Sequence, residues 1–363
     1  MERVHKSKKL TLRRFKMAQY YEYELGKAAK ILCEELLKLK PGETFVITAE
    51  TESDERVVDA AASAAFACGA KPMVIWTASP LGVGKAADPM LPVEALTAVL
   101  LKADAWVELN NKWLLYSTPY DIAVKENKKL RHLCLNGMTV DMMVRNMGRV
   151  DYPTLEKFMK LVTERTRSAK HVRITTPAGT DVEFDNKPGR KFLMELGYAN
   201  TPGSHMMAGQ IGWAPTFESI NGKIVFDGSL VPPIVGILQT PVSLTIEKGV
   251  IVKWEGGKEA IEYEKWLKGF NDPMMLKLAH VCYGFNPGAR LTGNILEDER
   301  VWGGTEWGIG NVGAIYIPGG ISGPSHSDGI CLNSSVWLDG VQITDKGQLL
   351  DPELKKLAEK LGK

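Results

Sequence analysis

The chain has 363 residues, of which 44% are hydrophobic, and its 45 Lys and Arg nearly balance 43 Asp and Glu. This length exceeds what one hydrophobic core usually sustains, so we expect two domains. The charge balance argues against a nucleic-acid footprint over the whole surface. No stretch approaches the roughly 20 apolar residues of a membrane span, and the start lacks the apolar run of a signal peptide, so we expect a cytoplasmic protein without membrane contact.

Residues 1–18 form a basic arm, with its charges at Lys6, Lys8, Lys9, Arg13, Arg14 and Lys16. This arm could reach a neighbouring subunit or an anion, and we favour a solvated, poorly ordered terminus. The five cysteines are widely scattered and never form a C-x-x-C pair. The sequence therefore predicts neither a disulfide framework nor a cysteine zinc site.

Residues 19–167 are predicted to form a Rossmann-like α/β domain with a mostly parallel sheet, because helix-like and strand-like segments alternate. Apolar residues at helical spacing predict the helices, and short apolar runs predict the strands. The expected helices cover residues 22–40, 55–68 and 92–102, and the expected strands cover residues 44–49, 72–76, 105–109 and 131–135. No G-x-G-x-x-G turn follows the first strand, so we predict no dinucleotide site.

Residues 168–363 are predicted to form a β-rich domain that follows a helix over residues 152–168. Short alternating segments predict strands at 171–176, 181–184, 223–227, 242–247 and 250–255, and helices are expected at 259–269 and 273–280. Glycines and prolines concentrate between Gly303 and Gly329. Such a density is typical of loops that shape a site. The predicted fold is thus an N-terminal Rossmann-like α/β domain and a C-terminal β-rich domain.

The segment His326-Ser327-Asp328 places an imidazole and a carboxylate two residues apart. In an extended backbone both side chains lie on the same face. Together they supply two members of the 2-His-1-carboxylate set that holds a catalytic metal and leaves coordination positions open. A His-x-Asp pair is also a common hydrogen-bonded pair, so the third ligand decides between the two interpretations.

Three further segments surround this motif in a recognisable order: Gly222 to Ser229, Ala279 to Gly293, and Glu297-Asp298-Glu299. With Ser325 to Gly329 they resemble the C-terminal half of the aminopeptidase T superfamily, whose peptidases use a two-metal site of carboxylates and histidines. Here Gln210 and His280 stand where those peptidases carry glutamates, and Glu306 replaces a histidine. Because carboxylates are lost, one metal is favoured over two.

The superfamily branch with a histidine at position 280 is the 2,5-dihydroxypyridine 5,6-dioxygenase branch, which binds a single Fe(II). The resemblance implies His280, His326 and Asp328 as metal ligands, and it makes residues 168–363 the β-rich catalytic and metal-binding domain. It also implies an extradiol-type ring-cleaving dioxygenase that takes dioxygen and a hydroxylated aromatic or N-heteroaromatic small molecule. Three protein ligands leave positions for both. Family resemblance further implies a homodimer or higher homo-oligomer.

Other candidates for positioning substrate or moving protons are His205, Glu195, Tyr116 and Glu306. Glu195-Leu196-Gly197-Tyr198-Ala199 resembles the dioxygenase, His205 falls in a loop with a substrate-contacting histidine, and Tyr116 stands where that family has a base histidine. Structural alternatives remain open. They are surface packing for His205, a core ring for Tyr116, a buried hydrogen-bond acceptor for Glu195 and a solvated loop charge for Glu306.

Two other functions remain open at this stage. A hydrolase of the aminopeptidase T type, an aminopeptidase or amidohydrolase, would use Zn, Mn or Co to activate water. A binding protein would keep the fold without turnover, and its ligand affinity would survive the loss of His280.

Overall fold

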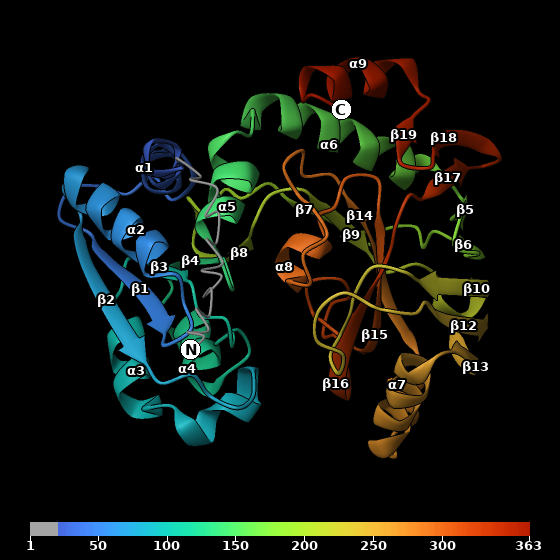
Figure 1. Cartoon of the computed structure of the whole chain (residues 1–363), viewed down its shortest axis with the longest axis horizontal. Coiled ribbons are helices and arrows are strands. Elements are labelled where there is room, and N and C mark those ends of the chain that lie inside the picture. Colours follow the sequence, from blue (N-terminus) through green and yellow to red (C-terminus); the bar gives the residue numbers. More distant parts are fainter. Residues whose placement is uncertain (1–20) are drawn as a thin grey trace, which may run out of the picture.

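The structure is a computed structural model that describes residues 21–363, so the predicted basic arm lies outside the described residues. Two lobes lie side by side, and α6 (Tyr152–Ser168) runs across the top between them (Figure 1). The C-terminal helix α9 (Pro352–Lys360) packs on α6, and Arg165 of α6 contacts Asp351 at the start of α9. The predicted combination of an α/β part and a β-rich part is confirmed.

The N-terminal lobe is built on a five-stranded parallel sheet in the order β2-β1-β3-β4-β8. Its strands are β1 (Thr44–Glu50), β2 (Lys71–Thr77), β3 (Ala105–Glu108), β4 (Arg131–Cys134) and β8 (Gly203–Met206). Its helices are α1 (Glu22–Lys30) continued by η1 (Ile31–Leu36), α2 (Glu55–Ala67), η2 (Gly84–Met90), α3 (Val93–Leu100), α4 (Thr118–Glu126), and α5 (Val140–Met143) continued by η3 (Val144–Gly148). Buried runs in β1, β3 and β4 form the centre of this lobe.

The edge strand β8 comes from beyond residue 168, where the C-terminal domain was predicted to begin. It pairs with β4 in parallel, with Leu133 opposite His205. The chain therefore enters the C-terminal lobe, returns to the first sheet for this strand, and leaves again. His205, expected in a loop, lies in this strand.

The C-terminal lobe contains two antiparallel sheets. The eight-stranded sheet has the order β13-β12-β10-β6-β5-β17-β18-β19, and the six-stranded sheet has the order β11-β16-β15-β14-β9-β7. The first comprises β5 (His171–Thr175), β6 (Asp181–Asp185), β10 (Asn221–Phe226), β12 (Val242–Glu247), β13 (Val250–Gly256), β17 (Ser335–Leu338), β18 (Val341–Asp345) and β19 (Gln348–Leu349). The second comprises β7 (Phe192–Glu195), β9 (Gln210–Trp213), β11 (Leu230–Val231), β14 (Leu278–Gly284), β15 (Thr305–Val312) and β16 (Ile321–Cys331). Helical segments η4 (Phe217–Ser219), α7 (Lys258–Gly269), η5 (Pro273–Leu276) and α8 (Ile295–Asp298) complete the lobe.

Aromatic rings join the two antiparallel sheets. Phe184 of the larger sheet contacts Trp213 and Trp307 of the smaller one, with ring centroids 6.3 Å and 5.6 Å away. Both tryptophans are fully buried, and burial of such rings dominates the energetics of a core. The two antiparallel sheets therefore pack against each other at Trp213 and Trp307.

The prediction of a helix over residues 273–280 is wrong. Only η5 is helical, and a fully buried strand, β14, begins at Leu278. Backbone geometry decides this, because Lys277 is already extended. The run from Val281 to Tyr283 suits a strand that is covered on both faces.

The prediction of loops between Gly303 and Gly329 is also wrong for most of that range, which forms β15 and β16. Several of these glycines serve close packing. A Cβ at Gly329 would lie 2.5 Å from the ring of Phe226. Glycine in a strand often marks such a close approach.

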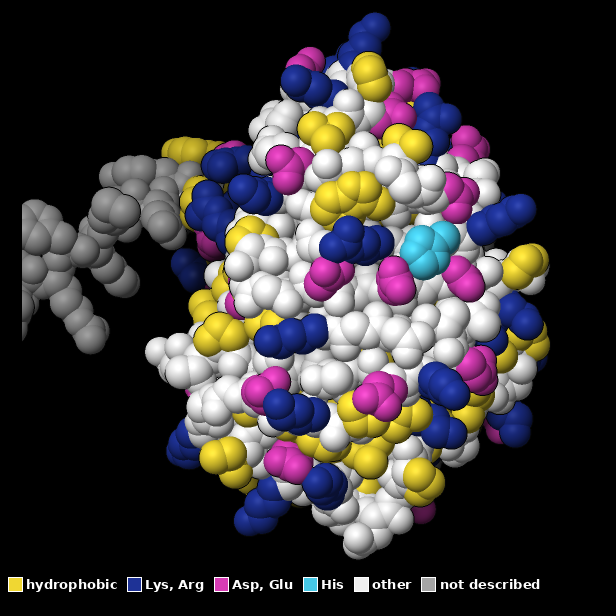
Figure 2. All heavy atoms as spheres, turned by 90° about the vertical axis from the view of Figure 1, so that its right-hand side faces the viewer, with side chains coloured by type: hydrophobic (Ala, Val, Ile, Leu, Met, Phe, Trp, Pro, Cys, Tyr) yellow, Lys and Arg dark blue, Asp and Glu magenta, His cyan; other side chains and the backbone are white. Residues whose placement is uncertain are grey.

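None of the helices in residues 21–363 combines the length and the apolarity needed to cross a bilayer. Figure 2 shows basic and acidic side chains interspersed over one side of the molecule, without a single-sign patch on that face.

Candidate metal centre

Three neighbouring strands of the six-stranded sheet bring the predicted ligands together. His280 on β14 lies opposite Gly308 on β15, and Gly308 lies opposite Asp328 on β16. Residues opposite each other across paired strands share a face, as do residues two apart along a strand. His326, two residues before Asp328, therefore joins the same face, and Glu306, two residues before Gly308, does so too.

The ligand-type atoms of His280, His326 and Asp328 all lie within 4.8 Å of one another. Asp328 Oδ1 is 2.9 Å from His326 Nε2 and 3.6 Å from His280 Nε2. The two imidazoles are nearly parallel, with centroids 5.1 Å apart. Ligands about 2.1 Å from one metal and at right angles lie about 3 Å apart, so this spacing suits a shared ion.

The hydrogen bond on the far side of His326 sets its tautomer. His326 Nδ1 is 2.7 Å from the carbonyl oxygen of Asn311, which can only accept, so Nδ1 carries the proton. Such an outer partner is typical of metal-ligating histidines. In the neutral ring Nε2 then presents a lone pair to Asp328, and two acceptors 2.9 Å apart need a cation between them.

A proton or a metal ion can fill that role. Burial lowers the pKa of His326, and Asp328 with Glu306 outweighs this and raises the pKa to about 9. The same two histidines and the carboxylate fit a divalent metal, because neutral imidazoles and carboxylates are ligands that iron accepts. The donor set therefore fits the group that the sequence predicts.

Glu306 lies directly beside this set and is almost fully buried. Its Oε1 is 2.9 Å from His280 Nε2, and its Oε2 accepts a hydrogen bond of 3.2 Å from Gln210 Nε2. Burial raises the pKa of Glu306, while His280 opposes that change. Of the two alternatives left by the sequence, the structure places Glu306 at the metal-ligand candidates and not in a solvated loop.

Gln210 is fully engaged in a polar network. Its Nε2 also donates to Glu299 Oε2 at 3.2 Å, and its Oε1 accepts from Arg300 Nη2 at 3.3 Å. Arg300 Nη1 in turn donates to Glu299 at 3.0 Å. Both ends of the amide thus bridge charged groups.

Tyr116 belongs to the other lobe and precedes α4. Its side chain is 63% exposed, which excludes the core-ring alternative, and its φ of +67° is in the left-handed region. A phenol has a reference pKa of about 10 and is protonated at neutral pH, so Tyr116 can donate a hydrogen bond.

His205 and Glu195 make hydrogen bonds at strand β8 and the loop before it. His205 Nε2 donates to the carbonyl of Thr201 at 2.9 Å. Glu195 is buried at the end of β7, and its Oε2 accepts from the backbone N–H of Met206 at 3.2 Å. Burial raises the pKa of Glu195. The described contacts of both residues hold β8 and its loop, and neither joins the cluster of ligand atoms.

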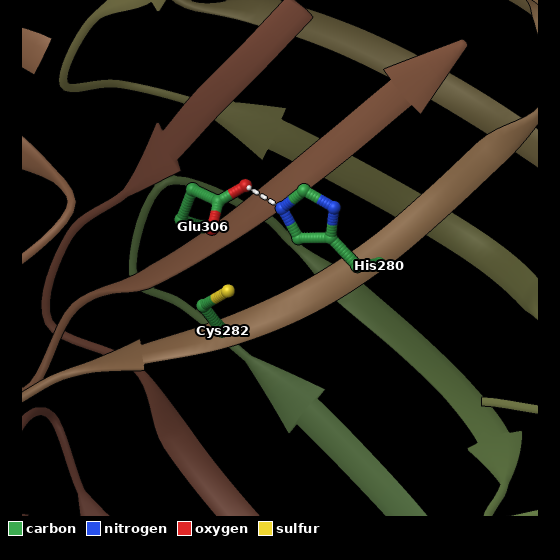
Figure 3. Close-up of side chains that lie close together, drawn as sticks. All are labelled: His280, Cys282 and Glu306. Carbon is green, nitrogen blue, oxygen red and sulfur yellow. Dashed lines mark ion pairs between the residues drawn. The ribbon is translucent and has the colours of Figure 1, made fainter. Parts of the chain in front are cut away.

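The sequence patterns singled out neither Asn311, Tyr316 nor Cys282 as part of the site. Cys282, His280 and Glu306 form a second cluster of ligand-type atoms within 4.8 Å (Figure 3). Burial, followed by the charge of Glu306, raises the pKa of the Cys282 thiol well above its usual range. The set of His280, His326 and Asp328 supplies two imidazoles and one carboxylate, which is the donor set predicted from the sequence, so it is the candidate metal site.

The fold, a parallel α/β lobe joined to a β-rich lobe, is shared with known enzymes. The solved structure of 2,5-dihydroxypyridine dioxygenase from Pseudomonas putida KT2440 has a TM-score of 0.72 at 20% identity, covering 92% of this chain and 99% of that chain. Wild-type AmpT from Thermus thermophilus has a TM-score of 0.64 at 14% identity, covering 91% and 100%. At these identities the likeness shows the fold alone.

The family follows from the sequence. The sequence model of the 2,5-dihydroxypyridine 5,6-dioxygenase family matches residues 31–351, and the chain belongs to that family. A curated 2,5-dihydroxypyridine 5,6-dioxygenase of Pseudomonas putida is 27% identical over 216 residues, which are 55% of this chain and 61% of that protein. The chain thus matches less than two thirds of the length of this relative. The predicted resemblance is confirmed.

Proposed function

We propose that this protein is a mononuclear non-haem Fe(II) dioxygenase that opens a hydroxylated aromatic or N-heteroaromatic ring of the dihydroxypyridine type. The observation that carries the proposal is the convergence of His280, His326 and Asp328 from adjacent strands, with the Asn311 carbonyl fixing the His326 tautomer. Fe(II), when bound, supplies the passage of electrons between an electron-rich ring and dioxygen. Membership of the family supports the reaction class.

The chain's own residues account for binding and proton movement. Two neutral imidazoles and one carboxylate leave a divalent ion with net positive charge, which attracts an anionic phenolate-type ligand. Glu306, whose raised pKa favours the protonated acid, is placed to hold or release a proton beside His280. Tyr116 would position the substrate by donating a hydrogen bond to one of its oxygens.

His205 and Glu195 act on this site through β8. By binding Thr201 and the Met206 backbone, they fix the strand that returns from the C-terminal lobe to the first sheet. We propose that both are positioning residues, and that the predicted domains, residues 19–167 and 168–363, meet around the site. A cytoplasmic location and a homo-oligomer also remain proposals.

The test combines metal content with oxygen consumption. Protein purified without oxygen is expected to bind one Fe(II) per chain and to consume dioxygen only when 2,5-dihydroxypyridine or a related dihydroxy aromatic is added. In His280→Ala, His326→Ala and Asp328→Asn, iron affinity is expected to fall at least about a hundredfold, because loss of even an outer partner costs about 10- to 100-fold. His171→Ala, an exposed histidine on β5, is the matched control and should bind iron normally.

The alternative hydrolase has a different signature. It would bind two zinc, manganese or cobalt ions and release an amine from an aminoacyl reporter without dioxygen. That result, or iron-free protein with no oxygen uptake, would overturn the proposal. The neutral Gln210, which stands where the peptidases carry a glutamate, favours the single-metal form.

A further inference from the structure

Cys282 and Tyr316 meet beside the candidate metal ligands. The Cys282 Sγ and the Tyr316 Oη are 3.7 Å apart. The Tyr316 ring stacks on the His280 imidazole, with centroids 4.5 Å apart and planes 18° from parallel. Cys282 is two residues after His280 on β14, so both side chains lie on the same face of the sheet. A thiol and a phenol thus share the immediate surroundings of one proposed ligand.

Gly212 on β9 shows how closely these groups converge. It lies opposite Cys282 across the strand pair. A Cβ at position 212 would fall 2.6 Å from Cys282 Sγ, 2.9 Å from Tyr316 Oη and 3.1 Å from Tyr316 Cε1. The sulfur and the ring edge that carries Oη and its ortho carbon therefore border one small volume, which only glycine leaves open.

This arrangement differs from that of the other buried thiols. Cys33 and Cys331 have an oxygen at 3.7 Å, from the Ala61 carbonyl and the Thr180 hydroxyl respectively, and Cys134 contacts the amide oxygen of Asn136. None of these three forms part of the clusters of ligand-type atoms found among residues 21–363. Of the four buried thiols, Cys282 alone combines a phenol neighbour with a place in such a cluster.

We propose that Cys282 and Tyr316 become covalently joined by a thioether bond between Sγ and Cε1, formed once in the metal-loaded protein in the presence of dioxygen. The Sγ–H and Cε1–H bonds break and one Sγ–Cε1 bond forms. Two protons and two electrons leave the pair, and dioxygen accepts them to become hydrogen peroxide. The proposal rests on the proposed function for the redox-active metal and for dioxygen.

The thioether would hold the Tyr316 side chain in one position. This residue lies in the glycine-rich connection between β15 and β16, within residues 313–320. A thioether would tie that connection to β14 and hold the phenol ring against His280. The cross-link would thereby restrict the motion of a metal ligand and of the loop beside it.

The experiment counts thiols and measures mass. Protein purified without metal and oxygen is loaded with Fe(II), exposed to air, reduced, denatured and alkylated. Of the five cysteines, Cys282 is expected to resist alkylation in the majority of iron-loaded chains. The intact mass should fall by two hydrogen atoms, and a protease digest should contain the Cys282 and Tyr316 peptides joined.

Matched variants separate this bond from other oxidation. Cys282→Ala and Tyr316→Phe should abolish the mass change, whereas Cys33→Ala should retain it. Iron content is measured in the same samples. Chains that bind iron yet remain fully alkylated after exposure to air would overturn the thioether alone. Chains that bind no iron would overturn the metal centre and the thioether together.

Discussion

Gly308 faces His280 so closely that a Cβ at position 308 would lie 2.3 Å from Cε1 and 2.5 Å from Nδ1 of the imidazole. Gly308 also stands opposite Asp328 on the other side of β15. A residue without a side chain in the middle strand is therefore what allows ligands from both outer strands to converge. The orientation of the His280 ring depends on this space.

Gly308→Ala is expected to displace the His280 ring and to lower iron affinity about tenfold or more, as for loss of an outer-shell partner. The measurement is iron binding by titration under anaerobic conditions, with folding checked by circular dichroism. Gly26→Ala is the control, because nothing lies within 4 Å of a Cβ there. Unchanged iron affinity in Gly308→Ala would show that iron binding does not depend on the space that Gly308 leaves for the His280 imidazole.

The sequence predicted a good part of this site, and the reasons for the misses are physical. His326 and Asp328 could be predicted to share a face because side chains alternate along a strand. His280 could be predicted as their partner only through its match to a family motif. Gly308 and Gly329 were predicted to lie in loops because dense glycines are typical of loops. Dense glycines also occur in strands where neighbouring side chains leave no room for a Cβ, as at these two positions. The return of β8 to the first sheet was invisible, because strand pairing across distant segments leaves no local periodicity.

Glu108, at the end of β3, holds the loop that carries Tyr116. Its Oε1 accepts hydrogen bonds from the backbone N–H groups of Leu114, at 2.5 Å, and Leu115, at 3.3 Å, and from Asn136 Nδ2, at 2.6 Å. Tyr116 follows directly, with its φ of +67°. A left-handed conformation costs about 1 to 3 kcal/mol and persists only where the surroundings impose it.

Glu108→Ala is expected to lower the free energy of unfolding by about 3 kcal/mol or more, because each buried donor left without a partner costs about 1 to 3 kcal/mol. Urea denaturation measures this loss. The exposed Glu94→Ala on α3 should change stability by less than about 0.5 kcal/mol. If the free energy of unfolding falls by the same small amount in both variants, Glu108 does not anchor the loop.

Arg145 and Glu297 form a buried ion pair between η3 of the first lobe and α8 of the second. Arg145 Nη1 and Glu297 Oε1 are 2.5 Å apart, and the side chains are 3% and 0% exposed. Removing one partner strands the other charge, so Arg145→Ala should cost about 3 to 5 kcal/mol of unfolding free energy.

The matched control is the surface pair of Arg149 and Glu24, which is 2.8 Å apart with side chains 49% and 40% exposed. Arg149→Ala should cost at most about 1 kcal/mol, since water screens an exposed pair. Chemical denaturation of both variants provides the comparison. Equal losses would contradict the assignment of Arg145 as the buried link between the lobes.

Asp298 is expected to make the stability of the fold depend on pH. It accepts backbone hydrogen bonds from Thr292, at 2.8 Å, and Gly293, at 3.0 Å. Burial raises its pKa from 3.8 to about 6. Between these values the folded protein binds more protons than the unfolded chain, so this residue's contribution to stability falls as pH rises through the window.

Asp298→Asn removes this ionisation. The unfolding free energy of the wild type, minus that of the variant, should therefore decrease by up to about 3 kcal/mol between about pH 4 and pH 7, at about 1.4 kcal/mol per pKa unit. Urea denaturation across this range measures the difference. Asp181→Asn is the opposite-sign control: its bond to Arg173 lowers the pKa of Asp181, so its stabilisation is lost as pH falls. A difference for Asp298 that is flat with pH would mean that the carboxyl ionises in the fold as freely as in the unfolded chain.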